Sequence, residues 1–221
     1  MQIPDLVLAS TSPRRKELLA LGGEPFELLA THLNEEPRLA ERPQEYVQRL
    51  ANEKAEAAKQ SLGEKDGLVL AADTTVVLDG KILGKPANVP EAREMLKSLR
   101  GRTHIVYTGL TLLRTSDGAR LNDVAATQVP MRDYADEEIE SYIASGDPLD
   151  KAGAYAIQHA GFHPVAGMDG CLANVVGLPL CHLKRSLEKW DLHFEQDLPA
   201  ACQAHLTYDC PVTDKILNWE L

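Results

Sequence analysis

The fold is decided by a stretch near the N-terminus that reads L-V-L-A-S-T-S-P-R-R-K-E-L-L (Leu6–Leu19). Its apolar start belongs to a run of strand length over residues 3–9, and a helical pattern covers residues 13–21 after a polar loop. Ser12 is a natural helix N-cap, a proline follows it at the first helical position, and Gly22–Gly23 ends the pattern. The stretch therefore predicts a strand, a loop and a helix in succession.

The rest of the chain continues this alternation of strands and helices. Asp79–Gly80 stands between apolar residues, which is the strongest short signal for a hairpin. Asp73 directly follows an apolar strand and is expected at its carboxyl end. The remaining elements are expected as helices over residues 45–60, 90–99 and 135–144 and as strands over residues 67–72, 104–114 and 121–131. The pattern predicts a layered mixed α/β fold.

The composition restricts the partners of the protein. The 221 residues include 23 Lys and Arg against 33 Asp and Glu, a net charge of −10, and only 5% are aromatic. Such a chain repels nucleic-acid polymers and anionic membranes unless its cations are concentrated in one place. No apolar run approaches the roughly 18–20 residues of a membrane helix, and Met1–Asp5 has no signal-peptide pattern. We therefore expect a cytoplasmic protein without a nucleic-acid polymer or membrane partner.

The four cysteines all lie in the last quarter of the chain, at positions 171, 181, 202 and 210. They form no C-x-x-C pair and no spacing typical of zinc ligands. Structural thiols are the favoured interpretation. A disulfide or an adventitious metal site stays open, because Cys202 and Cys210 stand in a tail with weak periodicity.

The start of the first helix has the groups that a bound phosphate requires. Hydroxyls and free backbone N–H groups at a helix N-terminus favour an anion. Arg14 and Arg15 in the first turn oppose the helix dipole unless an anion offsets their charge. The alternative is a plain N-cap followed by solvated arginines.

Further candidate groups lie along the chain. Lys54 falls on the apolar stripe of its helix and either extends past the edge of the core or points into a polar cleft. Asp73 after a strand is placed to bind a metal ion or activate a water, although a turn residue there is also common. Lys85 follows the hairpin closely, and Glu35–Glu36 would add ligands for a hard cation. Solvated loops are the alternative for both.

A last candidate is Gln158, at the polar end of a stretch of small residues. Its amide can both donate to and accept from a nucleobase edge, although a surface glutamine is the alternative. Cations, carboxylates, a helix start and an amide together form the set that metal-assisted chemistry on a nucleotide uses. The P-loop and G-x-G-x-x-G motifs are absent, so the site is of another type.

With these motifs in order, the chain resembles a Maf-type nucleoside triphosphate pyrophosphatase over about residues 3–189. The segments that carry the resemblance are Leu6–Leu19, N-E-E (Asn34–Glu36), L-A-N-E-K-A (Leu50–Ala55), A-A-D-T-T-V (Ala71–Val76), G-K-P (Gly84–Pro86), D-K-A-G-A-Y-A-I-Q (Asp150–Gln158) and V-G-L-P-L (Val176–Leu180). The resemblance divides the chain into a Maf-like domain, residues 1–189, and a C-terminal extension of unknown role, residues 190–221.

The resemblance implies metal-dependent hydrolysis of a nucleoside triphosphate, dTTP, UTP or a modified pyrimidine nucleotide, to the monophosphate and pyrophosphate. The reaction would remove unwanted or modified nucleotides from the precursor pool. By position, Asp73 matches the proton acceptor that deprotonates the attacking water. Glu36 matches an acidic position near the metal, which is Mg²⁺ or Mn²⁺. Asp73 also belongs to the residues matched to this metal site. The matched phosphate-binding positions are Ser12, Arg15, Lys54 and Lys85. The positions associated with substrate choice are Arg14, Thr74 and Gln158.

The resemblance also implies a fold and a substrate branch. The expected fold is two α/β lobes around a central twisted mixed sheet, with the nucleotide cleft between them, and a homodimer is possible. The S-P-R-R form, with D-T and I-Q, resembles the branch that acts on dTTP and UTP. Arg14 argues against the branch that acts on 7-methyl-GTP, which tends to carry Trp there. The chain departs from the family pattern over His159–Cys171.

A second function remains open. The same cleft could bind a nucleotide with little turnover and act as a regulatory module in cell division, the role from which the family takes its name. Asp73, Glu36 and the two lysines favour catalysis, since a binding module has no need of a base.

Overall fold

The computed structural model describes residues 3–159 and 161–221. Met1 and Gln2, which belong to the signal-peptide prediction, and Ala160, within the segment that departs from the family pattern, lie outside the described residues. No helix in the described part is long and apolar enough to cross a membrane.

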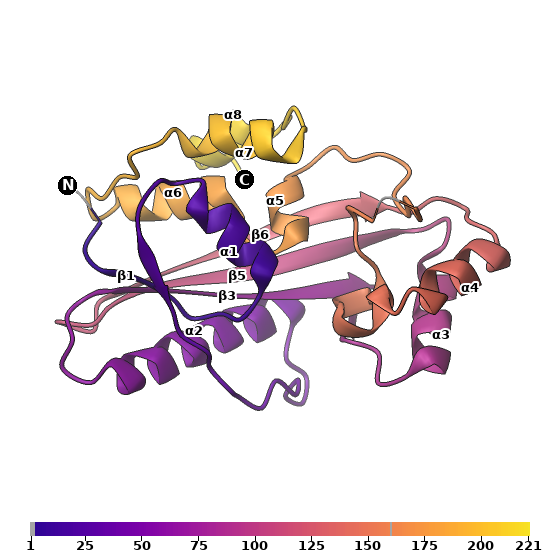
Figure 1. Cartoon of the computed structure of the whole chain (residues 1–221), viewed down its shortest axis with the longest axis horizontal. Helices are drawn as coiled ribbons and strands as arrows, with labels where there is room; N and C mark the ends of the chain where they lie inside the picture. Colours follow the sequence, from indigo (N-terminus) through magenta and orange to yellow (C-terminus); the bar gives the residue numbers. More distant parts are fainter. Residues whose placement is uncertain (1–2, 160) are drawn as a thin grey trace.

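A mixed six-stranded sheet forms the centre of the molecule (Figure 1). The strand order is β2-β1-β3-β5-β6, and β4 also pairs with β3. β1 is parallel to β2 and β3, whereas the contacts of β3 with β4 and β5, and of β5 with β6, are antiparallel. The strands are β1 (Leu6–Leu8), β2 (Phe26–Leu28), β3 (Leu68–Leu78), β4 (Lys81–Leu83), β5 (Thr103–Arg114) and β6 (Arg120–Pro130).

The prediction that Asp73 ends its strand is wrong, because β3 continues to Leu78. β5 pairs with β3 without interruption as far as Val77, so the polar residues from Asp73 onward remain in the ladder. The predicted hairpin follows at Asp79–Gly80, where both residues have positive φ, 50° and 78°. The first strand is also shorter than the apolar run that predicts it, since its pairing is limited to residues 6–8.

The helices cover the sheet on both faces (Figure 1). α2 packs across β3 and β5 on one face, while α1, α5 and α6 lie on the other, and α7 and α8 pack outside α6. The helices are α1 (Pro13–Ala20), α2 (Pro43–Leu62), α3 (Val89–Leu99), α4 (Asp136–Ala144), α5 (Leu172–Val176), α6 (Leu180–Glu188), α7 (Leu198–Leu206) and α8 (Thr213–Leu217). Two short 3₁₀ turns, η1 (Asp147–Asp150) and η2 (Ala152–Ala154), follow α4.

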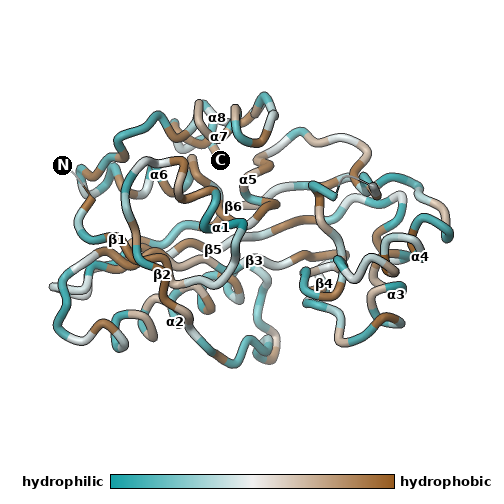
Figure 2. The backbone as a smooth tube through the Cα atoms, viewed as in Figure 1, coloured by the Kyte–Doolittle hydropathy of each residue, from teal (hydrophilic) through white to brown (hydrophobic). Residues whose placement is uncertain are grey.

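The two ends of the sheet form two lobes with separate hydrophobic clusters. One cluster joins β1, α1 and α6 to the tail, and the other joins the far ends of β3 and β5 to α3 and α4. Hydrophobic segments follow the inner strands, and the connecting loops are more hydrophilic (Figure 2). This arrangement confirms the predicted α/β class with a central mixed sheet.

The C-terminal extension packs into the first lobe. Leu198 of α7 and Ile216 of α8 are buried in the same cluster as Leu6 and Leu8 of β1. Arg185 of α6 fixes the last residues, because its guanidinium donates to the backbone oxygen of Ile216 at 3.0 Å. Burial of these apolar groups explains why a segment with weak periodicity folds against the domain.

Gly109 of β5 lies opposite Asp73 in the sheet and beneath α2. A Cβ at this position would lie 2.6 Å from the backbone of Val47, which cannot move without shifting α2. We predict that Gly109→Ala lowers the free energy of unfolding by about 1–3 kcal/mol, the usual cost of overpacking. Urea denaturation measures the change. Gly167→Ala is the matched control, because a Cβ there meets nothing within 4 Å, and equal stabilities would contradict the close approach of α2.

Candidate active site

A cleft of about 840 Å³ opens beside the middle of β3. β1 pairs with β3 over residues 68–70, and β4 pairs with it over residues 76–78 on the same edge. The edge between these two partners carries Asp73, Thr74 and Thr75, which line the cleft. Alternation along the strand sends the first two side chains to opposite faces of the sheet.

The N-terminus of α1 forms one wall of the cleft. Ser12 caps the helix by accepting a hydrogen bond from the backbone N–H of Arg15 at 3.4 Å, as the sequence predicts. Ser10 precedes it and accepts from the backbone N–H of Ser12 at 3.2 Å. Arg14 also lines the cleft. Hydroxyls, a helix start and guanidinium groups therefore face the same space, which favours an anionic ligand.

Arg15 is held by the protein and is not a solvated arginine. Its Nε donates to the carbonyl of Gly177 at 2.9 Å, and a terminal nitrogen donates to Thr74 Oγ1 at 3.0 Å. Thr74 Oγ1 lies 2.9 Å from Thr108 Oγ1, which in turn donates to the carbonyl of Asn174 at 3.2 Å. Because Thr74 accepts from Arg15 and Thr108 donates to Asn174, the proton between the two hydroxyls belongs to Thr74. The chain of donors fixes the orientation of the guanidinium group.

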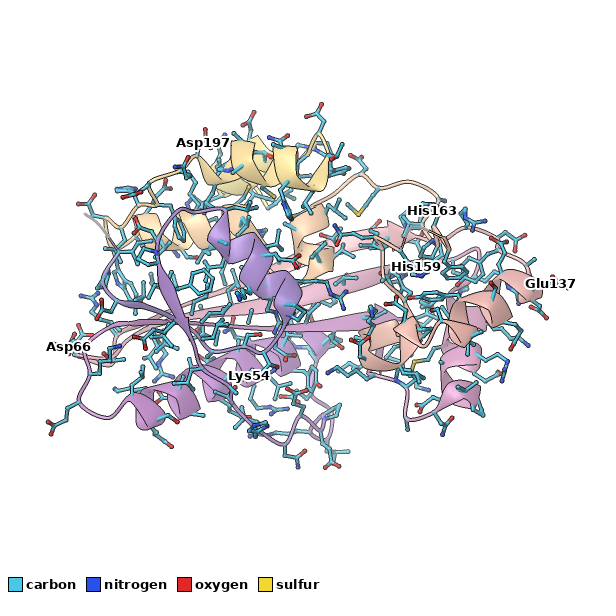
Figure 3. The ribbon with its side chains drawn as sticks, viewed as in Figure 1. Lys54, Asp66, Glu137, His159, His163 and Asp197 are labelled. Atoms are coloured by element: carbon cyan, nitrogen blue, oxygen red, sulfur yellow. The ribbon has the colours of Figure 1, made fainter. Side chains whose placement is uncertain are left out.

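Lys54 belongs to α2, on the opposite face of the sheet from α1 (Figure 3), and lines the cleft. Its Nζ lies 2.5 Å from Asp73 Oδ1 and 2.7 Å from Glu35 Oε1. The lysine is buried, so these two carboxylates supply the partners that a buried ammonium requires. The polar-cleft interpretation of Lys54 is the one that the structure supports.

Asp73 lies in an environment that disfavours its charge. Burial raises its pKa above the usual value, and the nearby Lys54 and Arg15 oppose this shift. Glu35 behaves in the opposite way: burial alone would raise its pKa, but the hydrogen bond and charge of Lys54, with Lys85 and Arg15, lower it. Two carboxylates on one ammonium thus have pKa values shifted in opposite directions, a pattern found where acid and base roles are divided.

Not all of the other predicted site residues line the cleft. Lys85 and Glu36 line the cleft, but the carboxylate beside Lys54 belongs to Glu35, and Glu36 accepts a hydrogen bond from the Asn34 amide nitrogen at 3.4 Å. Gln158 is exposed and does not line the cleft. The roles of Glu36 in metal binding and of Gln158 in substrate choice stay predictions.

Sequence reasoning passed over two residues of the segment that ends at Gln158. Lys151 and Tyr155 line the cleft from the second lobe. Lys151 is held against Asp147 at 2.9 Å, and the Tyr155 hydroxyl lies 2.7 Å from Nε2 of the buried His104. The signal was the segment itself, because Asp150–Gln158 is one of the segments that carry the family resemblance.

The fold and cleft define a layered α/β protein in which cations and carboxylates from two lobes converge on one open strand edge. Residues 5–190 match the family described as Maf-like protein, and the chain belongs to this family.

Relatives with assigned names agree with this membership. A dTTP/UTP pyrophosphatase of Methylococcus capsulatus is 49% identical over 189 residues, 85% of this chain and 92% of the relative. One of Syntrophus aciditrophicus is 46% identical over 183 residues, 83% of this chain and 88% of the relative. Among solved structures, the Staphylococcus aureus Ham1 protein is similar over 73% of this chain and 79% of its own, with a TM-score of 0.46 at 14% identity.

His104 makes the stability of the protein depend on pH. Burial lowers its pKa from 6.5 to about 4, so the unfolded chain takes up a proton here at a higher pH than the folded protein does. The contribution of the neutral His104 to the free energy of unfolding is therefore fully present above pH 6.5. It is lost as the pH falls toward 4, by up to about 3 kcal/mol. We predict that His104→Gln makes this loss shallower in urea denaturation between pH 7 and pH 4.5. His182, whose pKa burial also lowers to about 4, accounts for part of the loss that remains.

The control for this experiment is His205→Gln, on an exposed position of α7. It is expected to leave the slope of stability against pH as in the wild type. A His104→Gln protein with the wild-type slope would show that His104 does not carry the linkage.

Proposed function

We propose that this protein hydrolyses a nucleoside triphosphate between the α- and β-phosphates, giving the nucleoside monophosphate and pyrophosphate. The observation that carries the proposal is the convergence of Arg15, Lys54 and Asp73 from α1, α2 and β3 on one cleft. The names of the relatives support the same reaction. In this role the protein would remove unwanted nucleotides from the precursor pool.

The cleft supplies positioning and charge for the reaction. Ser12 and Arg15 at the start of α1, with Lys85 across the cleft, would bind the phosphates, and the fixed guanidinium group would need no reorganisation. Asp73 would orient the attacking water and accept its proton, a role that suits a carboxyl group whose pKa is raised by burial. Lys54 between Asp73 and Glu35 would hold the base in place.

The residues of the cleft fit a divalent cation that takes part of its ligands from the substrate. Glu35 and Asp73, which both pair with Lys54, line the cleft together with Glu36 and would supply carboxylate oxygens. Among the described residues no three His, Cys, Asp or Glu side chains are grouped closely enough to hold an ion by themselves. This agrees with Mg²⁺, which is usually bound by one or two carboxylates with phosphates and water. When bound, the ion would neutralise charge on the phosphate oxygens.

We further propose dTTP and UTP as the preferred substrates. Both relatives described above carry these nucleotides in their names. Arg14 lines the cleft beside the phosphate-binding groups, and Thr74 holds Arg15, so both can affect how the nucleotide lies. Gln158 would have to reach the base from its exposed position.

The first test of the reaction is Asp73→Asn. We predict a loss of turnover of about 10²- to 10⁴-fold, the usual reach of general-base catalysis, with nucleotide binding largely kept because Glu35 still pairs with Lys54. Pyrophosphate release with Mg²⁺ measures turnover, and calorimetry with a non-hydrolysable α,β-methylene analogue measures binding. Asp66→Asn, on an exposed loop (Figure 3), is the matched control. Unchanged turnover would remove Asp73 from this role.

The same measurements separate catalysis from regulation. A wild-type protein that binds the analogue but releases no pyrophosphate from any triphosphate would contradict hydrolysis. That result would favour the nucleotide-binding module.

Substrate choice is tested at Arg14. We predict that Arg14→Trp changes the order of kcat/KM among dTTP, UTP, CTP, GTP and ATP, since the aromatic ring replaces a cation that lines the cleft. Inorganic tripolyphosphate has no base, so its inhibition constant is expected to change much less than the ratios of kcat/KM among the nucleotides. An unaltered substrate order would exclude Arg14 from base selection.

A further inference from the structure

The four cysteines, far apart in the sequence, meet around one small cavity of about 10 Å³. Cys171 precedes α5, Cys181 lies in α6, Cys202 lies in α7 and Cys210 precedes α8. All four are free thiols, and three are buried, whereas Cys210 is half-buried. The cavity holds about one water-sized sphere, so only a small molecule can enter it.

The loops that carry Cys171 and Cys210 lie side by side. The Tyr208 hydroxyl donates to the carbonyl of Gly170 at 2.9 Å, which joins the residue before Cys171 to the residue two positions before Cys210. The backbone N–H of Cys210 donates to Gln203 Oε1 at 2.9 Å and fixes the second loop on α7. The Cys171 and Cys210 thiols line the same cavity, and their interaction shifts their two pKa values in opposite directions.

This interaction makes the two thiols unequal. The neighbouring Cys171 lowers the pKa of Cys210 to about 6, although burial opposes the shift. The neighbouring Cys210 and burial together raise the pKa of Cys171 well above its usual value. Burial raises the pKa of Cys181 to about 11 and that of Cys202 to about 12. At neutral pH the nucleophilic thiolate of the cluster is therefore Cys210, which is also its most exposed member.

A metal does not explain this cluster. No three His, Cys, Asp or Glu side chains in the described ranges, 3–159 and 161–221, are placed to hold an ion. A thiolate beside a protonated thiol is instead the arrangement of an oxidisable pair.

We propose that Cys210 and Cys171 form a peroxide-sensitive pair, in which Cys210 is the oxidised thiol and Cys171 resolves it to a disulfide. The Cys210 thiolate attacks one oxygen of hydrogen peroxide, the O–O bond breaks, and the departing hydroxide takes a proton to leave as water. Cys171 then attacks the sulfenic sulfur, its proton leaves with the hydroxyl group as a second water, and the S–S bond forms. Two thiols lose two electrons in total, and peroxide gains them.

The disulfide would connect the tail to the wall of the cleft. Cys171 is the residue before α5, whose Val175 and Val176 line the cleft. Gly177 follows, and its carbonyl accepts from Arg15. Cys171 therefore lies four residues from Val175 and six from Gly177 in the sequence, and the proposed pair does not depend on the proposed hydrolysis.

The test is peptide mapping of the reduced full-length protein before and after brief treatment with hydrogen peroxide, without reducing agent. We expect the mass to fall by two hydrogen atoms and a cross-linked peptide to join Cys171 to Cys210. A different pairing, or oxidation of Cys181 or Cys202 before Cys210, would overturn the proposal. Stoichiometric zinc in the purified protein, released when the thiols are blocked, would also overturn it.

Single variants separate the two roles. Cys171→Ser should trap a sulfenic acid at Cys210 that dimedone labels, and Cys210→Ser should abolish both label and cross-link. Cys181→Ser and Cys202→Ser are matched controls from the same cavity and should form the cross-link at the wild-type rate. Equal peroxide reactivity of the wild type and Cys210→Ser would exclude Cys210 as the reacting thiol.

Discussion

The cleft depends on how the outer edge of β3 is shared between two partners. β1 pairs with one end of this edge and β4 with the other, so the middle has no strand beside it. β5 pairs with the opposite edge throughout and keeps the open part extended. Asp73 and Thr74 are therefore held rigidly while their edge stays accessible, and they point to α2 and α1 respectively. One strand thus positions a carboxylate and a hydroxyl for two different helices.

The charges that converge on this edge explain one another. A buried ammonium at Lys54 is costly without partners, and a buried carboxylate at Asp73 is costly without a cation. Their contact offsets both penalties, and Glu35 supplies a second anion at the open side of the cleft. Apolar residues at these positions would fold with less desolvation. Burial disfavours the charges of Lys54 and Asp73, so a charged ligand in the cleft best explains why charged residues stand at these two positions.

The sequence predicts what local interactions determine and misses what pairing between distant segments determines. The cap at Ser12, the turn at Asp79–Gly80 and the unusual place of Lys54 follow from near neighbours, and the structure has all three. The end of β3 was misplaced because three polar residues interrupt an apolar run, while the ladder that continues it comes from β5. The contact of Lys54 with Glu35 rather than Glu36, and the link from Thr74 through Thr108, depend on how loops and strands meet in space.

The packing of the tail also depends on contacts with distant segments, which its sequence does not predict. Its amino-acid pattern is weak because α7 and α8 are short helices that contribute a few apolar residues each to a core built mainly by other elements. Arg185 compensates for this: it pairs with Asp123 of β6 at 2.8 Å, donates to the tail backbone, and lies 4.3 Å from the ring centroid of Trp219. Because α5 and α6 lie between the tail and the sheet, an extension without a clear sequence signal becomes part of the support for the wall that holds Arg15.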